Sequence, residues 1–465
     1  MGNQKHFWYS QLIQKTGGEV MFKKLLAGLL AASLVLSLAS CNNGGGDTSS
    51  TESTGGDSSA AESTGGNGGG DGEYSGTLTI WEGDPSRAVC GDAYKAYFAE
   101  KYPNLEIKME TKTENTYQSA LSSAFGANQG PDVFWNWGTK NGILESIVAE
   151  DYVMPLTDIA DMSLFEKDGK KTMISGICYV NDILYGVPTA AVDTRTIYYN
   201  KDIFEEHGYK PSEKLSDFEA MCDQMLADGI QPLTVAATEY SSLFHVYDFI
   251  LCACKGGPEF IKDTEAVKAK QNDPRGVYAL EKYMSWRDKG YFSPASTGND
   301  ASAAVLEFAQ GGTAMIICGS WLLSNVKGAN EDLNFDVYKL ANEEDGKIYS
   351  CITANGSYSI GANTQNLDNA KMFIKWMCTA EAQKTWMDAC NSVPGIPEVE
   401  AADPIASEIG TADEQISGYY ELLAATAVNG TPNKADEENW VPLWNGQITV
   451  EEFANRVAEQ QDAVK

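Results

Sequence analysis

Strand-like and helix-like segments alternate along the chain from about residue 76 onward. Segment 77–81 (TLTIW) has the pattern of a short strand, and segment 92–102 carries aromatic residues at helical spacing. Segment 105–110 alternates as a second strand, and segment 114–127 follows as a second helix. Such alternation is typical of helices layered on a sheet. We therefore predict an α/β fold.

The same alternation continues to the end of the chain. We predict strands or extended runs at 131–137, 184–202, 313–319, 337–341 and 349–353, and helices at 146–156, 213–228, 241–254, 273–289, from 321, 368–378, 380–389 and 447–462. No period of 20–50 residues recurs in this part of the chain, which argues against a repeat fold.

Size and charge narrow the class of protein further. The 465 residues suggest two or three domains, or one large two-lobed body. There are 34 basic and 65 acidic side chains, for a formal charge of −31, whereas nucleic-acid binding needs a basic surface. We therefore predict no nucleic-acid partner. Only three histidines are present, which leaves little room for a His-rich metal site.

The N-terminal region reads as an export signal. Lys23 and Lys24 precede an apolar run, 25–39, which is shorter than the roughly 20 residues that a membrane span needs. The run ends in Leu-Ala-Ser followed by Cys41, a pattern that looks like a bacterial lipobox. We predict that residues 1–41 are a signal peptide with lipobox, that Met21 is the true start, and that Cys41 is lipidated; a plain signal peptide is the alternative.

A segment poor in apolar residues follows the signal. Residues 42–75 are rich in Gly, Ser and Thr, and we predict a flexible tether because such a chain cannot offset its conformational entropy by burial. A lipid at its start would hold the folded body near a membrane surface. Nine cysteines remain after Cys41, an odd number whose spacing suggests no disulfide framework.

Several motifs, taken in order, resemble one family. They are TLTIWEGD at 77–84, YFAEKYPNLEIK at 97–108, GPDVFWNW at 130–137, LYGVP and IYYNKDIFEEHGY within 184–209, FAQGGTAMIICGSW at 308–321, NAKMFIKWM at 369–377 and EAQKTW at 381–386. Together they resemble the maltose-binding-protein-like extracellular solute-binding proteins of carbohydrate ABC importers. One departure is at 211–217, where the tryptophan that the family often has near the start of a helix is missing.

The resemblance implies an α/β, two-lobed periplasmic-binding-protein fold of type II, with the ligand cleft between lobes joined by crossing hinge strands. Residues 76–193 and about 352–396 would form the first lobe, and residues from about 194 to 351 with 397–465 the second. We also predict a monomer without cofactor, anchored by the lipid on Cys41 on the extracellular side of the cell membrane. Lobe closure would capture a sugar or oligosaccharide and deliver it to the permease subunits.

A sugar ring offers an apolar face to aromatic side chains and a rim of hydroxyls to carboxylates and amides. Tryptophans and tyrosines near predicted strand and helix ends are therefore candidates for stacking, namely Trp135, Trp137, Trp321, Trp440, Tyr240 and Tyr247. Polar candidates at positions that match the family are Glu82, Asp84, Asp193 and Asn355, with Tyr358 beside them. Trp286, Trp376 and Trp386 lie within predicted helices at core-like spacing, and we predict that they are core residues.

Three other functions compete with sugar binding. A binding protein for a non-sugar solute stays open, although amino-acid capture usually uses an arginine and the arginines here are not clustered in the sequence. A secreted glycoside hydrolase would need two carboxylates, which any chain this acidic contains, and no HExxH, GxSxG or Walker-type motif is present. A surface adhesin would need no crossing strands. We predict that the chain is not an enzyme and holds no catalytic or metal site.

Overall fold

The computed structural model describes the last two residues of the predicted tether and most of the region after it: residues 74–83, 87–112, 114–139, 143–419, 422 and 434–463. The predicted signal peptide, Cys41 and Asp84 lie outside these ranges. Within them, no helix has the length and apolar character needed to cross a bilayer. The same residues contain no group of three or more His, Cys, Asp or Glu side chains that could hold a metal ion.

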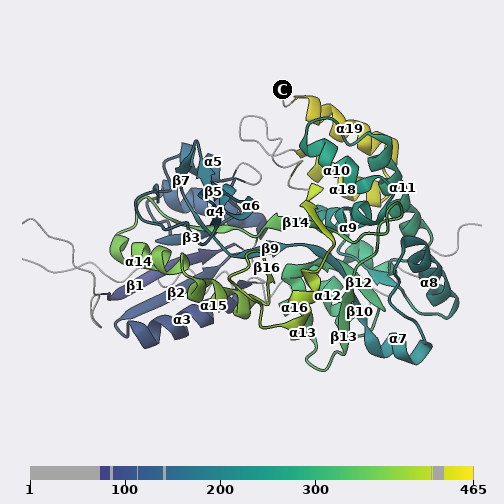
Figure 1. Ribbon diagram of the computed structural model, residues 1–465, viewed down its shortest axis with the longest axis horizontal. Helices are drawn as coiled ribbons and strands as arrows, with labels where there is room; N and C mark the ends of the chain where they lie inside the picture. Colours follow the sequence, from purple (N-terminus) through teal and green to yellow (C-terminus); the bar gives the residue numbers. More distant parts are fainter. Residues whose placement is uncertain are drawn as a thin grey trace, which may run out of the picture. The chain divides into compact units, whose positions relative to one another are not determined.

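The first sheet has five strands in the order β2-β1-β3-β15-β8. Figure 1 labels β1, β2 and β3 of this sheet. β1 runs parallel to β2 and β3, whereas β15 is antiparallel to β3 and β8. The bounds are β1 Gly76–Glu82, β2 Leu105–Thr111, β3 Val133–Asn136, β8 Val187–Pro188 and β15 Ser357–Ile360, with helices α3 Val89–Lys101, α4 Glu114–Gly126, α5 Ile143–Ala149, α14 Leu367–Met377 and α15 Ala380–Cys390. The strand-then-helix order predicted for this region is confirmed.

The centre of this sheet is buried on both faces. All four residues of β3, from Val133 to Asn136, are buried, so β3 does not show the in-and-out alternation of a half-exposed strand. β3 lies in the middle of the sheet, between β1 and β15, and a strand whose two faces are both covered by other elements has no exposed side.

The second sheet has four strands in the order β11-β12-β10-β13. β10 is antiparallel to both of its neighbours, and β11 is parallel to β12. The strands are β10 Arg195–Asn200, β11 Leu233–Thr234, β12 Met315–Gly319 and β13 Phe335–Tyr338, and the helices of this region are α7 Lys201–His207, α8 Leu215–Ala227, α9 Tyr240–Ala253, α10 Gly257–Glu265, α11 Pro274–Asp288, α12 Ala301–Ala309 and α13 Leu323–Ala329. Short 3-10 helices occupy Pro294–Gly298 (η3) and Ser320–Leu322 (η4).

A third sheet, in the order β16-β9-β14-β17, connects the other two through the chain. Its strands are β9 Ala191–Asp193, β14 Tyr349–Ala354, β16 Val393–Pro394 and β17 Glu414–Ser417. β9 continues into β10 after Thr194, and β14 continues into β15 after Asn355 and Gly356. Two chain segments thus pass between the first and second sheets here, where the resemblance places hinge strands.

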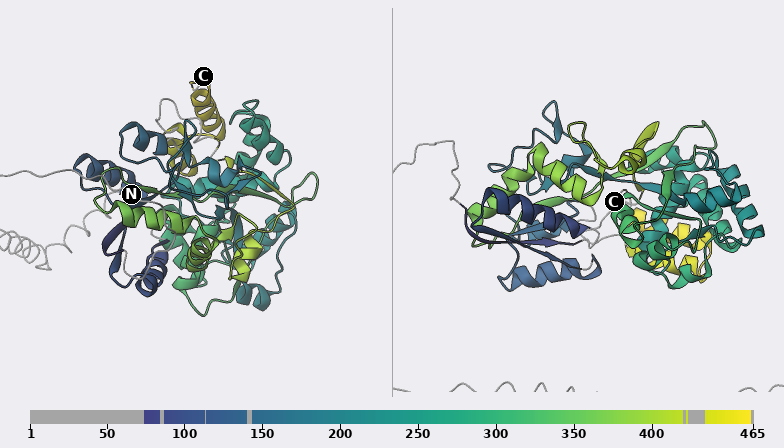
Figure 2. Two further views of the ribbon diagram at one scale, coloured as in Figure 1. Left: turned by 60° about the vertical axis from the view of Figure 1, so that its left-hand side comes forward. Right: turned by 90° about the horizontal axis from the view of Figure 1, so that it is seen from below.

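The remaining elements are short, apart from two helices at the C-terminus. They are β4 Glu166–Lys167, β5 Lys170–Lys171, α6 Met173–Gly176, β6 Tyr179–Val180, β7 Ile183–Leu184, α16 Pro404–Ile409, α18 Lys434–Trp444 and α19 Val450–Ala463. Figures 1 and 2 show α18 and α19 in yellow among the teal helices of the second sheet. Trp440 joins this packing, with its ring 4.7 Å from Phe453 and 5.4 Å from Tyr247, measured between centroids.

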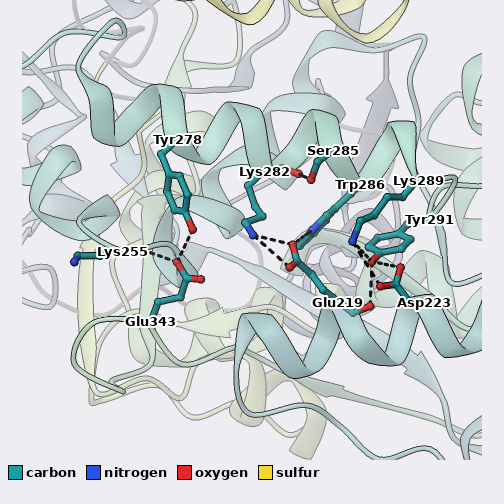
Figure 3. Close-up of polar contacts among 10 residues, drawn as sticks. All are labelled: Glu219, Asp223, Lys255, Tyr278, Lys282, Ser285, Trp286, Lys289, Tyr291 and Glu343. Carbon is teal, nitrogen blue, oxygen red and sulfur yellow. Dashed lines mark hydrogen bonds and ion pairs between the residues drawn. The ribbon is translucent and has the colours of Figure 1, made fainter.

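Helices α8 and α11 are joined by a buried tryptophan and polar contacts (Figure 3). The indole nitrogen of Trp286, a residue with no exposed surface, donates to a carboxylate oxygen of Glu219 at 2.7 Å. The ammonium of Lys282 lies 3.2 Å from the same oxygen. Trp286 and Trp386 are fully buried and Trp376 is 8% exposed, which confirms the prediction that these three are core residues.

Candidate functional site

The first group of polar residues lies where β1 ends. Glu82 is fully buried, and one of its carboxylate oxygens accepts a hydrogen bond from the hydroxyl of Tyr358 at 3.0 Å. Burial raises the pKa of Tyr358 well above its usual value, so the phenol keeps its proton and acts as the donor. The other Glu82 oxygen accepts from the backbone N–H of Gly83 at 3.1 Å. This carboxylate is therefore held in a fixed orientation.

Arg87 and Asp193 form the second part of this group. The guanidinium of Arg87 lies over the ring of Trp135, 4.4 Å from its centroid, and its Nη2 is 3.8 Å from Oδ2 of Asp193. The other oxygen of Asp193 accepts from the amide of Asn355 at 2.8 Å. Both charged side chains of this pair are almost completely buried. We call Glu82, Arg87, Trp135, Asp193 and Asn355 the first cluster.

Two glycines allow the aromatic rings of this region to approach the backbone closely. A Cβ at Gly83 would lie 2.4 Å from the ring of Tyr117, and a Cβ at Gly356 would lie 2.4 Å from the ring of Trp135. The hydroxyl of Tyr117 in turn donates to the carbonyl of Trp135 at 2.6 Å. No side chain larger than hydrogen fits at either glycine without displacing these rings.

A second group forms around Arg195, the first residue of β10. Its Nη2 lies 3.3 Å from Oδ2 of Asp248, and both side chains are buried. Its Nε donates to Nδ1 of His245 at 3.1 Å. Because Nδ1 accepts this bond, the neutral ring carries its proton on Nε2. His245 and Asp248 are both residues of α9, so this helix aligns them against the sheet.

Trp321 completes the second group. Its ring makes an edge contact with His245, with centroids 4.7 Å apart, and lies 5.4 Å from the guanidinium carbon of Arg195. A Cβ at Gly319 would lie 2.2 Å from the indole, so the ring folds across the end of β12 because that residue is glycine. Trp321 is half-buried. We call Arg195, His245, Asp248 and Trp321 the second cluster.

Three consecutive residues connect the clusters. Asp193 belongs to the first cluster and Arg195 to the second, and Thr194 lies between them. The backbone N–H of Thr194 donates to Ser320 Oγ at 3.1 Å, and its hydroxyl is 2.5 Å from Ser350 Oγ. The segment that passes from the first sheet to the second is thus hydrogen-bonded to β14 and to the turn before Trp321.

The sequence-predicted residues fall into three sets. Asp193 and Asn355 are hydrogen-bonded to each other, Glu82 is bound by Tyr358, and the half-buried Trp321 lies in the second cluster. Two further candidates are half-buried, Trp137 and Tyr240. The ring centroid of Trp137 is 4.7 Å from that of Trp135, and Tyr240 is the first residue of α9. Four aromatic residues have at most 1% of their surface exposed, which leaves no ring face for a ligand in this conformation: Trp135, Tyr247, Tyr358 and Trp440.

The sequence did not predict the arginines of the two clusters or the carboxylate of the second. We left Arg87 and Arg195 out because the arginines are scattered in the sequence, and we did not select Asp248. The fold brings each arginine to a carboxylate on another element. The only available signal was the Asp-Thr-Arg triplet at 193–195, where opposite charges flank the predicted crossing.

A surface hollow of about 460 Å³ lies beside β16. It is lined by Pro394, Gly395, Ile396, Pro397, Val399, Glu400, Ala401 and Ser407. None of the residues of the two clusters lines it, and its lining offers no aromatic ring for a sugar face. We therefore base the candidate site on the clusters.

Comparison with known proteins shows which sequences this chain is similar to. The galactooligosaccharide-binding protein of Bacillus subtilis is 26% identical over 446 residues, covering 92% of this chain and 93% of its own length. A maltooligosaccharide ABC transporter solute-binding lipoprotein of Streptococcus pneumoniae is 23% identical over 329 residues, covering 70% and 73%.

Solved structures establish the fold. An ABC transporter solute-binding protein from Thermotoga lettingae, solved with α-D-tagatose, superposes with a TM-score of 0.66 at 18% identity, covering 84% of this chain and all of that one. The predicted two-lobed α/β fold of type II is thus confirmed. The family described as bacterial extracellular solute-binding protein matches residues 93–413. The chain belongs to this family of extracellular solute-binding proteins.

Proposed function

We propose that this protein captures a sugar or oligosaccharide for an ABC importer. The support comes from the family, from relatives that are named for galactooligosaccharide and maltooligosaccharide, and from the two clusters joined by residues 193–195. Closure of the two lobes on the solute would bring the clusters together around it. The closed form would then be recognised by the permease subunits of the importer.

The charge balance of the clusters is the observation that favours a neutral ligand. Arg87 lies against Asp193 and Arg195 against Asp248, so each buried guanidinium has a carboxylate beside it. A carboxylate or phosphate on the solute would have to displace one of these buried partners, and leaving a buried charge without its partner is costly. A neutral polyhydroxylated solute needs hydrogen bonds only. This balance supports a sugar over an acidic solute.

The proposed contacts divide by chemistry. The half-buried rings of Trp321, Trp137 and Tyr240 would cover apolar sugar faces, and Asp193, which is 8% exposed, would accept from hydroxyls at the edge of the first cluster. Glu82 is fully buried and would act by holding Tyr358 in place. Asn355 would orient Asp193. We leave Trp135, Tyr247, Tyr358 and Trp440 out of the contact set because they are buried in the cores.

The cellular setting is part of the proposal. Lipidation of Cys41 and the tether that follows would hold the protein on the extracellular side of the cell membrane, next to the permease. We propose that the protein acts as a monomer, without a cofactor and without turning over its solute.

A thermal-shift screen tests the solute class. The chain from residue 41 with Cys41→Ser is melted in the presence of mono- and oligosaccharides, and of amino acids and peptides as the comparison set. A bound solute raises the melting temperature according to its concentration relative to Kd. A shift with sugars alone supports the proposal, and a shift with amino acids or peptides alone contradicts it. Release of a cleaved glycoside by the same sample would contradict the binding-only function.

A further inference from the structure

The thiols of Cys252 and Cys351 face each other inside the second core. Cys252 is the residue before the last of α9, and Cys351 is the third residue of β14. Their sulfur atoms are 3.3 Å apart, although the two residues are separated by 99 positions in the sequence. Both are buried, with 5% and 2% of their surface exposed. The fold therefore brings two thiols from different elements into direct contact.

The distance between these sulfurs is close to that of a bond. A disulfide has a sulfur–sulfur length of about 2.05 Å, so the two atoms need to approach by only about 1.2 Å. The Cys252 thiol and burial raise the pKa of Cys351 well above its usual value. Since the thiolate is the attacking species, the reaction is slow in the folded chain and faster while the chain folds and the thiols are still accessible.

We infer that Cys252 and Cys351 are a disulfide-forming pair that joins α9 to β14 when the chain folds with a disulfide oxidant. Extracellular proteins fold where such oxidants occur. One cysteine attacks the oxidant, forms a mixed disulfide and releases one oxidant thiol. The second cysteine then attacks the protein sulfur of that mixed disulfide and releases the other. The protein loses two hydrogens, which the oxidant gains.

The disulfide would join α9 to β14, the strand that leads from the third sheet into the first. β14 pairs with β9 and leads into β15, and α9 carries Asp248 one helical turn before Cys252. The bond would close a loop of about 100 residues in the unfolded chain, which restricts that chain and so favours folding. We expect the oxidised protein to melt several degrees higher than the reduced protein. This inference does not depend on the identity of the solute.

The test uses the full chain with Cys41→Ser, refolded in oxidised and reduced glutathione. We expect intact mass spectrometry to show a loss of about 2 Da, and peptide mapping without reduction to show Cys252 linked to Cys351. The linked peptides should disappear after reduction. Mapping that finds both cysteines as free thiols, or that finds Cys351 linked to Cys254 or to another cysteine, overturns the inference.

A matched pair of variants separates the bond from general thiol effects. Cys351→Ala should abolish both the mass loss and the rise in melting temperature on oxidation. Cys222→Ala removes another fully buried thiol that lies on α8, and it should leave both effects in place. If the two variants respond alike, the pair is not the source of the stabilisation. The mapping of the unsubstituted chain stands even if one variant fails to fold.

Discussion

At the scale of single residues, burial separates the aromatic side chains more sharply than sequence position does. Trp321 and Trp440 were both predicted as cleft residues. Trp321 is half-buried beside Arg195. Trp440 is only 1% exposed and packs against aromatic rings of α9 and α19. The difference depends on α18, α9 and α19 packing together. Contacts between elements this distant in sequence cannot be deduced from the residues next to a tryptophan.

Trp321→Ala should weaken sugar binding by about 1–3 kcal/mol, because the indole supplies the apolar face for stacking. Isothermal titration with the sugar identified by thermal shift measures the change. The control is Tyr278→Ala, which removes an exposed ring on α11 that touches Glu343 and neither cluster. Equal affinities in the folded Trp321→Ala variant and the parent would remove this ring from the site.

Val267 occupies a conformation that suits glycine. Its φ is 56°, its side chain is 88% exposed, and it follows the C-terminus of α10. The N–H of Lys268 donates to Asp263 O and that of Val267 to Thr264 O, the two bonds of a Schellman motif. Its position after the helix requires the left-handed region, where a β-branched side chain is strained.

Val267→Gly should therefore raise the free energy of unfolding by about 1 kcal/mol, since relief of strain outweighs the added flexibility of the unfolded chain. Urea denaturation measures it. Val267→Ala keeps a Cβ but loses the branch, and it should give a smaller gain. A glycine variant less stable than the parent would contradict the assignment of strain.

At the scale of elements, the sequence predicts the long periodic segments well. The observed helices α8, α9, α11, α14 and α15 each lie within two residues of the predicted bounds. The sequence did not predict α10, which begins at Gly257, the second of two adjacent glycines, and contains a proline in its first turn, or α18, which contains Pro442. In the sequence, glycine and proline predict a turn or loop. These two helices form because they pack against other elements, which the neighbouring residues do not reveal.

The N-terminus of α11 offers a test of pH dependence. Asp273 caps this helix by accepting from the N–H of Arg275 at 3.0 Å, and its carboxylate also binds the Arg275 guanidinium. The Arg275 hydrogen bonds are the largest cause of a lowered Asp273 pKa. A carboxylate with a lowered folded pKa contributes stability that is present above the unfolded pKa and is lost as the pH falls through the folded pKa.

Asp273→Asn keeps a good capping residue but removes the charge. We expect the variant to be about 1 kcal/mol less stable than the parent at neutral pH, with the difference shrinking as the pH falls through the lowered folded pKa of Asp273. Urea denaturation at several pH values measures both. A difference that is independent of pH would show that the cap geometry, and not the ion pair with Arg275, was disturbed.

At the scale of the whole molecule, the chain has a large negative net charge, whereas the charged side chains of the site are paired. The formal charge is −31, yet each buried arginine of the clusters lies beside a carboxylate. The field of the chain opposes any anionic solute, and it has little effect on a neutral one. The dependence of affinity on salt therefore reports the charge of the solute.

We predict that sugar affinity changes less than about twofold between about 50 mM and 500 mM NaCl, because screening alters only interactions between charges. Titration calorimetry at both concentrations measures it, with Trp321→Ala at the same two concentrations as the control for effects unrelated to charge. An anionic solute would bind more tightly at high salt, since screening weakens its repulsion from the acidic chain. A steep rise in affinity with salt would therefore contradict the neutral-ligand proposal even if the solute were a sugar, and would indicate an acidic or phosphorylated one.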